Sequence, residues 1–91
     1  MPKATREAII RNKLGLHIRP SRQLATLVRK YDAEVIIRNQ ERTASAESQL
    51  DLLMLLATVG SAVTIEADGP DAEEAAAQLA ALIESGFGEE I

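Results

Sequence analysis

The 91-residue sequence contains no cysteine and no tryptophan, and its aromatic side chains are limited to Tyr31 and Phe87. Without cysteine the chain can form no disulfide, iron–sulfur cluster, cysteine-ligated zinc site or thiol nucleophile. With so few aromatics and a net charge of −4, general nucleic-acid binding is not expected. The core must therefore be aliphatic. A chain of this length predicts one small domain, residues 1–91, with no deep cavity.

Long apolar runs are also missing. The longest, residues 52–59, is far shorter than the roughly 20 residues that a membrane-spanning helix needs. The first ten residues contain too few apolar side chains for a secretion signal. We therefore expect a soluble, cytoplasmic protein.

Charge is unevenly distributed along the chain. All ten basic residues lie between Lys3 and Arg42, whereas residues 43–91 carry ten acidic residues and no basic one. The net charge is +6 for residues 1–42 and −10 for residues 43–91. Such segregation favours a charged face that meets a partner, although ordinary solvated faces are its commoner cause.

The spacing of apolar residues and turn formers predicts alternating strands and helices. Strands are expected at 7–11, 34–38, 43–46 and 61–67, and helices at 18 to about 30, 49 to about 57, and 72 until Gly86 ends it. Asp71 is expected to cap the last helix in a capping box with Glu74. The tail, residues 87–91, is expected to fray unless Phe87 packs back. The order β-α-β-β-α-β-α favours an α+β fold with all three helices on one face of a four-stranded antiparallel sheet.

The most informative segment is Gly15-Leu16-His17-Ile18-Arg19-Pro20-Ser21. Gly15 allows a sharp turn, Pro20 suits the first turn of a helix, and the free N–H groups of that turn point back toward His17. Arg19 adds a forked donor that suits phosphate oxygens. Imidazole is a good nucleophile near neutral pH and forms a labile N–P bond. The segment predicts a site that accepts, holds and releases a phosphoryl group, although a lone histidine more often only caps a helix or packs in a loop.

The same segment resembles the active site of the HPr family, the histidine phosphocarriers of the bacterial phosphotransferase system. Similarity extends over nearly the whole chain, through NKLGLHIRP, YDAEVIIRN, ASAESQLDLLML, VTIEADGP and LIESGFGEE, and is greater to the nitrogen-related branch, NPr, than to the sugar-transport branch. The resemblance implies an open-faced β-sandwich of four antiparallel strands and three helices. It also implies that His17 is phosphorylated on Nδ1, that Arg19 steadies the phosphoryl group, and that Gly15 and Pro20 shape the site.

Three residues near His17 depart from the family pattern. Ile18 and Ser21 stand where alanine is common, and Leu14 stands where some sugar-transport relatives have asparagine. The last departure weakens the expectation of a side-chain amide near His17. Ile18 is expected to add apolar area to a partner-docking surface. Arg22, one helical turn after Arg19, is expected either to border that surface and meet acidic partners or to be simply solvated.

The helix predicted at 49–57 is more apolar than a single buried stripe requires. Three of its side chains are expected in the core: Leu52, Leu55 and Leu56. Three others are left either for a docking patch beside His17, as the resemblance also implies, or for a second buried face: Leu50, Leu53 and Met54.

Ser48 is expected to cap this helix, which would contribute roughly 1 kcal/mol. The resemblance implies a second role, because a matching serine in several HPr proteins is phosphorylated by a dedicated kinase. Glu47 and Asp51 flank Ser48 and make an added phosphate less favourable. Capping alone is therefore the preferred interpretation.

Other chemistries are poorly supported. Ser21 lies four residues after His17, but no oxyanion-loop motif accompanies this pair, so a hydrolase is not expected. The acidic residues near the last turn, Asp68, Asp71, Glu73 and Glu74, lack the spacing of a calcium loop. No glycine-rich phosphate loop is present.

We therefore expect a phosphoryl carrier rather than a stand-alone enzyme. His17 would accept a phosphoryl group from an enzyme I-type donor and pass it to an enzyme IIA-type acceptor. The chain is expected to be monomeric and to make transient contacts, without a cofactor, a metal, nucleic acid or a membrane. The alternative is a non-catalytic, HPr-like regulatory binding protein, switched by phosphorylation of Ser48 by an HPr kinase.

Overall fold

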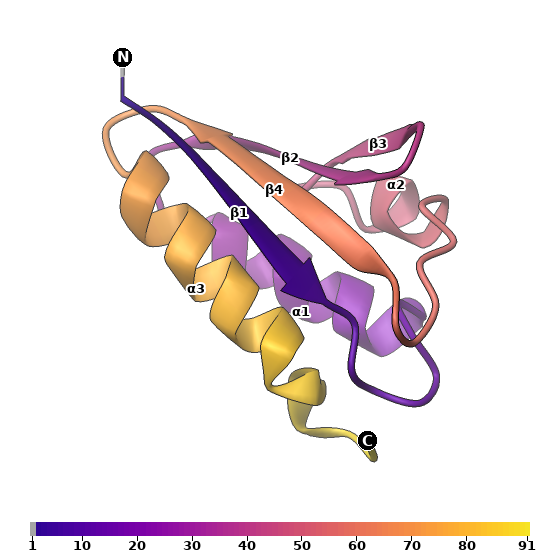
Figure 1. The fold of residues 1–91 in the computed structure, drawn as a ribbon. Coiled ribbons are helices and arrows are strands. Elements are labelled where there is room, and N and C mark those ends of the chain that lie inside the picture. The colour runs from indigo at the N-terminus through magenta and orange to yellow at the C-terminus, as the bar shows by residue number, and fades with distance from the viewer. Residues whose placement is uncertain (1) are drawn as a thin grey trace.

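The computed structural model describes residues 2–91 (Figure 1). Its elements follow the predicted order β-α-β-β-α-β-α. They are β1 (Lys3–Ile9), α1 (Ile18–Val28), β2 (Glu34–Asn39), β3 (Arg42–Ser45), α2 (Gln49–Leu53), β4 (Ala62–Asp68) and α3 (Ala72–Glu84), followed by a short 3-10 turn, η1 (Gly86–Gly88).

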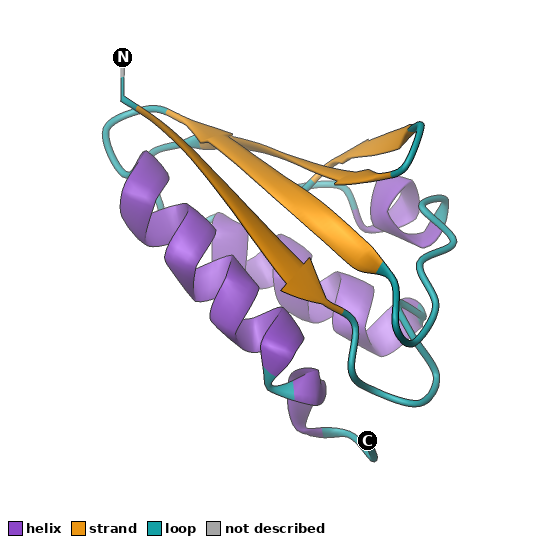
Figure 2. Cartoon of the chain, in the orientation of Figure 1, coloured by secondary structure: helices purple, strands orange, loops and turns teal. Residues whose placement is uncertain are grey.

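The four strands form one antiparallel sheet in the order β1-β4-β2-β3. β4 lies between β1 and β2, so that Ile65 is paired with Arg6 on one side and with Ile37 on the other. α1 and α3 lie side by side against one face of this sheet, and within residues 2–91 no helix covers the opposite face (Figures 1 and 2). The predicted α+β class and open-faced antiparallel sheet are confirmed.

The core between the sheet and the helices is aliphatic. Val63, Ile65 and Ala67 of β4 are buried, as their alternation predicts, and Leu24 and Val28 of α1 pack against the same layer. The predicted stripe of α3 is buried except for the half-buried Leu82: Ala72, Ala75, Ala76, Leu79 and Ile83. No helix described in residues 2–91 is long and apolar enough to span a membrane.

Several predicted element boundaries differ from those of the structure. β1 begins at Lys3 and ends at Ile9, because backbone pairing with β4 extends over polar residues that show no apolar pattern. α1 ends at Val28, two residues before the predicted end. The N–H groups of Lys30 and Tyr31 there bond to carbonyls three residues back, which closes the helix in a turn.

α2 is also shorter than predicted, ending at Leu53 instead of near residue 57. The side-chain amide of Asn39 donates to the carbonyl of Leu55 at 3.0 Å, and Leu56 adopts a left-handed φ of 55°. Leu52 and Leu55 are fully buried, as predicted, but Leu56 is 60% exposed. Its predicted place in the core is wrong because the left-handed turn ends the helical spacing that would have buried it.

Asp71 precedes α3 as predicted, but its side chain makes no capping hydrogen bond. Its Oδ2 instead accepts the N–H of Asp32 at 2.7 Å, while the carbonyl of Asp32 accepts the N–H of Asp71 at 3.0 Å. The predicted capping box with Glu74 is therefore wrong, because the loop before β2 occupies the carboxylate that would have capped the helix.

Candidate active site

His17 is the residue immediately before α1, where its backbone is extended and its side chain forms no capping bond. The first hydrogen bond of the helix runs from the N–H of Ser21 to the carbonyl of His17, at 3.0 Å. The N–H groups of Ile18 and Arg19 precede this bond, and Pro20 has none. The imidazole is 34% exposed and sits at the electropositive end of α1, a position suited to an anion.

The loop before His17 is anchored to the chain that follows α2. Gly15 has a φ of +70°, and its carbonyl accepts the N–H of His17 at 2.9 Å. The N–H of Leu16 donates to the carbonyl of Ala57 at 3.0 Å. Together with the buried Pro20, these contacts set the entry of the chain into α1.

The imidazole of His17 is held by the carboxylate of Glu89, a residue that the sequence analysis did not place in the site. Nε2 of His17 lies 2.8 Å from Oε1 and 3.0 Å from Oε2 of Glu89. An ionised carboxylate only accepts hydrogen bonds, so Nε2 carries the hydrogen and the neutral ring keeps its lone pair on Nδ1. Within residues 2–91 Nδ1 has no hydrogen-bond partner, which leaves it available to react.

Several contacts fix Glu89 in this position. The side-chain amide of the buried Asn12 donates to the carbonyl of Gly15 at 2.7 Å and to Oε1 of Glu89 at 3.1 Å. The hydrogen bond from His17 is the main cause that lowers the pKa of Glu89. The Asn12 bond and the charges of His17 and Arg19 also lower this pKa, while desolvation opposes them. Asn12 thus supplies the amide near His17 that Leu14 had made doubtful.

The prediction that the tail frays is wrong. Phe87 packs back, which was the alternative to fraying: it is buried, and the N–H of Lys13 donates to the carbonyl of Glu90 at 2.9 Å. The tail is held because its one aromatic side chain anchors it beside α3. That lone aromatic, two residues before a glutamate, was the available sequence signal for Glu89.

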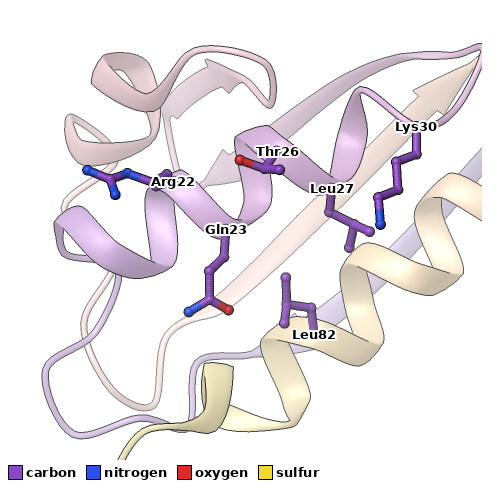
Figure 3. Close-up of a pocket in the computed structure, with 6 residues that line it drawn as sticks. All are labelled: Arg22, Gln23, Thr26, Leu27, Lys30 and Leu82. Atoms are coloured by element: carbon purple, nitrogen blue, oxygen red, sulfur yellow. The ribbon is translucent and has the colours of Figure 1, made fainter.

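The two arginines of the first turns of α1 differ in their surroundings. Arg19 is 65% exposed, and its Nη1 lies 3.8 Å from Oε2 of Glu89, too far for a hydrogen bond but close enough for attraction. Arg22 is exposed and borders a shallow groove of about 350 Å³ between α1 and α3. Figure 3 shows Leu27 and Leu82 facing one another across this groove, whose lining includes no carboxylate and no imidazole.

Exposed apolar side chains surround the start of α1. The apolar patch expected from the sequence comprises Ile18, Leu50 and Met54, which are exposed, and Leu53, which is half-buried. Gln49 links the two helices, since its side-chain amide donates to the carbonyl of Ile18 at 3.0 Å. The exposure of Leu50 and Met54 argues against a second buried face on this helix, and partner docking stays a prediction. Leu14, which also lines the hollow around His17, is an exposed apolar residue that the predicted patch did not include.

Comparisons with known proteins identify the family of this chain. The family profile described as PTS HPr component phosphorylation site covers residues 4–85. The chain belongs to the HPr family. Phosphocarrier protein NPr of Escherichia coli K12 is 49% identical to it, over 89% of this chain and 91% of the relative. Phosphocarrier protein HPr of Cupriavidus necator is 44% identical, over 92% and 94% of the two chains. The crystal structure of HPr-C-His from Thermoanaerobacter tengcongensis superposes with a TM-score of 0.86 at 34% identity, over the full length of both chains. This HPr-family chain is a phosphocarrier of the phosphotransferase system.

Ser48 caps α2 in this HPr-family chain, as predicted. Its Oγ accepts the N–H of Asp51 at 3.1 Å. The carboxylate of Asp51 accepts the N–H of Ser45 at 3.4 Å, which links the start of α2 to the end of β3. These contacts explain Ser48 as a structural residue.

The alternative chemistries find no support in the described part of the chain. Ser21 is buried, and its hydroxyl donates to the carbonyl of Leu16 at 3.3 Å instead of pairing with the ring of His17. Within residues 2–91 no group of three or more His, Cys, Asp or Glu side chains is placed to hold a metal ion.

Proposed function

We propose that His17 is the phosphoryl-accepting residue of this phosphocarrier. It takes the phosphoryl group from the phosphohistidine of an enzyme I-type donor and passes it to a histidine of an enzyme IIA-type acceptor. The observation that carries the proposal is the imidazole at the start of α1, with Nε2 held by Glu89 at 2.8 Å and Nδ1 unpaired within residues 2–91.

The chemistry follows from the position of the ring. The lone pair of Nδ1 attacks phosphorus in line with the donor nitrogen, a new N–P bond forms, and the donor N–P bond breaks with its electron pair returning to the donor ring. The N–H groups of Ile18 and Arg19 and the guanidinium of Arg19 stabilise negative charge on the equatorial oxygens. The second transfer runs the same steps toward the acceptor.

Transfer requires that the donor and acceptor enzymes dock beside His17. The apolar patch of Ile18, Leu50, Leu53 and Met54 lies beside His17 and offers a docking surface to both partners. The same side chains must release each partner after transfer, which favours a modest, transient interface and a monomeric carrier. In this scheme the chain turns over only with its partner enzymes, in the cytoplasm, and is not itself an enzyme. The 49% identity to an NPr favours the nitrogen-related branch.

The direct test is labelling from phosphoenolpyruvate. The chain is incubated with an enzyme I and radioactive phosphoenolpyruvate, then with a IIA protein. We expect an acid-labile, base-stable label on the chain that passes to the acceptor, and none on the His17→Ala variant. An acid-stable, base-labile label, or one that survives in His17→Ala, contradicts the proposal.

A regulator that acts only by binding would behave differently. Its cellular effects would persist in full when His17→Ala replaces the natural chain, because its docking surface is intact. We expect those effects to be lost. Phosphorylation of Ser48 by a kinase stays a prediction, since the capping contacts account for that residue without it.

A further inference from the structure

Glu89 is placed to take part in phosphoryl transfer although it lies 72 residues from His17 in sequence. We propose that the Glu89 carboxylate is a positioning residue that holds Nε2–H of His17 and supplies the counter-charge for the positive imidazole ring formed during transfer. This inference rests on the proposed role of His17 as phosphoryl acceptor.

The carboxylate is fixed before any phosphoryl group arrives. Both oxygens of Glu89 lie within hydrogen-bond distance of Nε2, at 2.8 and 3.0 Å, and its side chain is only 11% exposed. Asn12 holds Oε1 from the other side, at 3.1 Å. The backbone around Glu89 is anchored by the buried Phe87 on one side and by the bond from Lys13 to Glu90 on the other. A carboxylate held in this way needs little reorganisation when charge develops on the ring.

Charge develops on the ring because of how the bonds change. Nδ1 donates its lone pair to phosphorus while Nε2 keeps its hydrogen, so the ring becomes cationic as the N–P bond forms. The donor nitrogen keeps the electron pair of the N–P bond that breaks. Glu89 faces Nε2, the nitrogen that does not carry the phosphoryl group, and its bond to the cationic ring is charge-assisted and stronger than its bond to the neutral ring. The difference lowers the barrier to forming phospho-His17 and keeps the phosphorylated ring protonated, which makes it the better leaving group in the second transfer.

The other charged groups around the ring do not replace this carboxylate. Arg19 lies 3.8 Å from Oε2 of Glu89 and is largely exposed, so it is free to turn toward an incoming phosphoryl group. Lys13 and Glu90 also line the hollow around His17, but their side chains lie 3.8 Å from one another and both are exposed. Glu90 is therefore a matched control, because it is the same residue type, one position along the tail.

The test uses phosphoramidate, a small phosphoryl donor that needs no partner enzyme and releases ammonia as its N–P bond breaks. Formation of phospho-His17 is followed by 31P NMR in the natural chain, Glu89→Gln and Glu90→Gln. We expect Glu89→Gln, which keeps the size but not the charge, to react roughly five- to tenfold more slowly. Glu90→Gln is expected to react within about twofold of the natural chain. Backbone amide spectra show whether each variant keeps the fold.

A second readout separates electrostatics from a merely structural role. The 31P resonance of phospho-His17 should titrate at a lower pH in Glu89→Gln than in the natural chain, because the protonated ring has lost its counter-charge. The inference is overturned if Glu89→Gln is labelled as fast as the natural chain or faster, or if neither chain reacts. It is also overturned if the folded variant shows the same 31P titration as the natural chain. If enzyme I fails to phosphorylate His17 while phosphoramidate still labels the natural chain faster than Glu89→Gln, the result counts against the proposed function alone.

Discussion

Gly15 lies so close to Ala57 that a β-carbon at residue 15 would stand 2.7 Å from the Ala57 carbonyl oxygen. Gly60 also has a positive φ, of +89°, but its missing β-carbon faces open space. We expect Gly60→Ala to lower the free energy of unfolding by about 1–2 kcal/mol, the usual cost of a left-handed alanine, and Gly15→Ala by clearly more. Urea unfolding of both variants measures the difference. Equal losses would mean that the Ala57 contact does not constrain the loop before His17.

Arg19 should matter to transfer more than Arg22, although both are exposed arginines one helical turn apart on α1. Arg19 lies beside the ring of His17 and Glu89, whereas Arg22 borders the groove between α1 and α3. We expect Arg19→Ala to slow phosphorylation of His17 about tenfold, less than a buried oxyanion donor contributes because this side chain is solvated. Rapid-quench labelling by enzyme I measures the rate. A variant Arg22→Ala that is slowed as much as Arg19→Ala would remove the special role of Arg19.

Leu50 should contribute to partner affinity without contributing to the core, since it is exposed in the apolar patch. If this side chain is buried in the interface, replacing Leu50 with serine should raise the dissociation constant of the complex with enzyme I roughly tenfold. Ile36→Ser is the control, because Ile36 is an exposed apolar residue of β2. Calorimetric titration with enzyme I should show weaker binding for Leu50→Ser alone. Unchanged binding by Leu50→Ser would exclude this residue from the docking surface.

The cap at Ser48 makes a prediction about stability. Ser48→Ala removes the acceptor for the N–H of Asp51 and should lower the free energy of unfolding by about 1 kcal/mol. Ser48→Asp keeps an acceptor at the same position and should lose much less. Thermal unfolding of the three chains measures both effects. If Ser48→Asp is as unstable as Ser48→Ala, the hydrogen bond is not what stabilises α2.

The hydrogen bonds of Glu84 predict that the fold loses stability in acid. Its carboxylate accepts the N–H of Ile9 at 2.6 Å and Nε–H of Arg11 at 2.7 Å, which ties the end of α3 to the end of β1. The bond from Ile9 is the largest cause that lowers the pKa of Glu84 below its ordinary value of 4.5, followed by the bond from Arg11. Its contribution to stability is therefore fully present above pH 4.5 and is lost as the pH falls through the lowered pKa.

Glu84→Gln should accordingly be less stable than the natural chain near pH 7, and its free energy of unfolding should decline less steeply below pH 4.5. Urea unfolding at a series of pH values measures both slopes. Parallel curves for the two chains would show that Glu84 titrates alike in the folded and unfolded states.

The part of the site that is local in sequence could be predicted from it. The segment from Gly15 to Ser21 contains a turn residue, a histidine, a forked donor and a helix-starting proline within one short stretch, and each has a known preference. The aliphatic alternation of β4 and the alanine-rich stripe of α3 likewise determine which faces are buried. These features depend on near neighbours along the chain, so residue type and spacing are sufficient.

The parts that were missed depend on contacts between distant segments. Glu89 reaches His17 because Phe87, between two glycines and with a φ of 59°, folds the tail back. Asn12 reaches Glu89 across 77 residues. Leu56 turns outward in a left-handed turn, where Asn39 at the end of β2 binds the carbonyl of the neighbouring Leu55. None of these partners can be identified from apolar spacing, which carries no information about which loop lies beside which.

The identity of the phosphorylated nitrogen tests the proposed mechanism most directly. The chain, with 15N-labelled histidine, is phosphorylated by enzyme I and phosphoenolpyruvate and examined by 15N and 31P NMR. Because Glu89 holds Nε2–H, the phosphoryl group is expected on Nδ1 of His17. A phosphoryl group on Nε2, or on any residue other than His17, would contradict the mechanism.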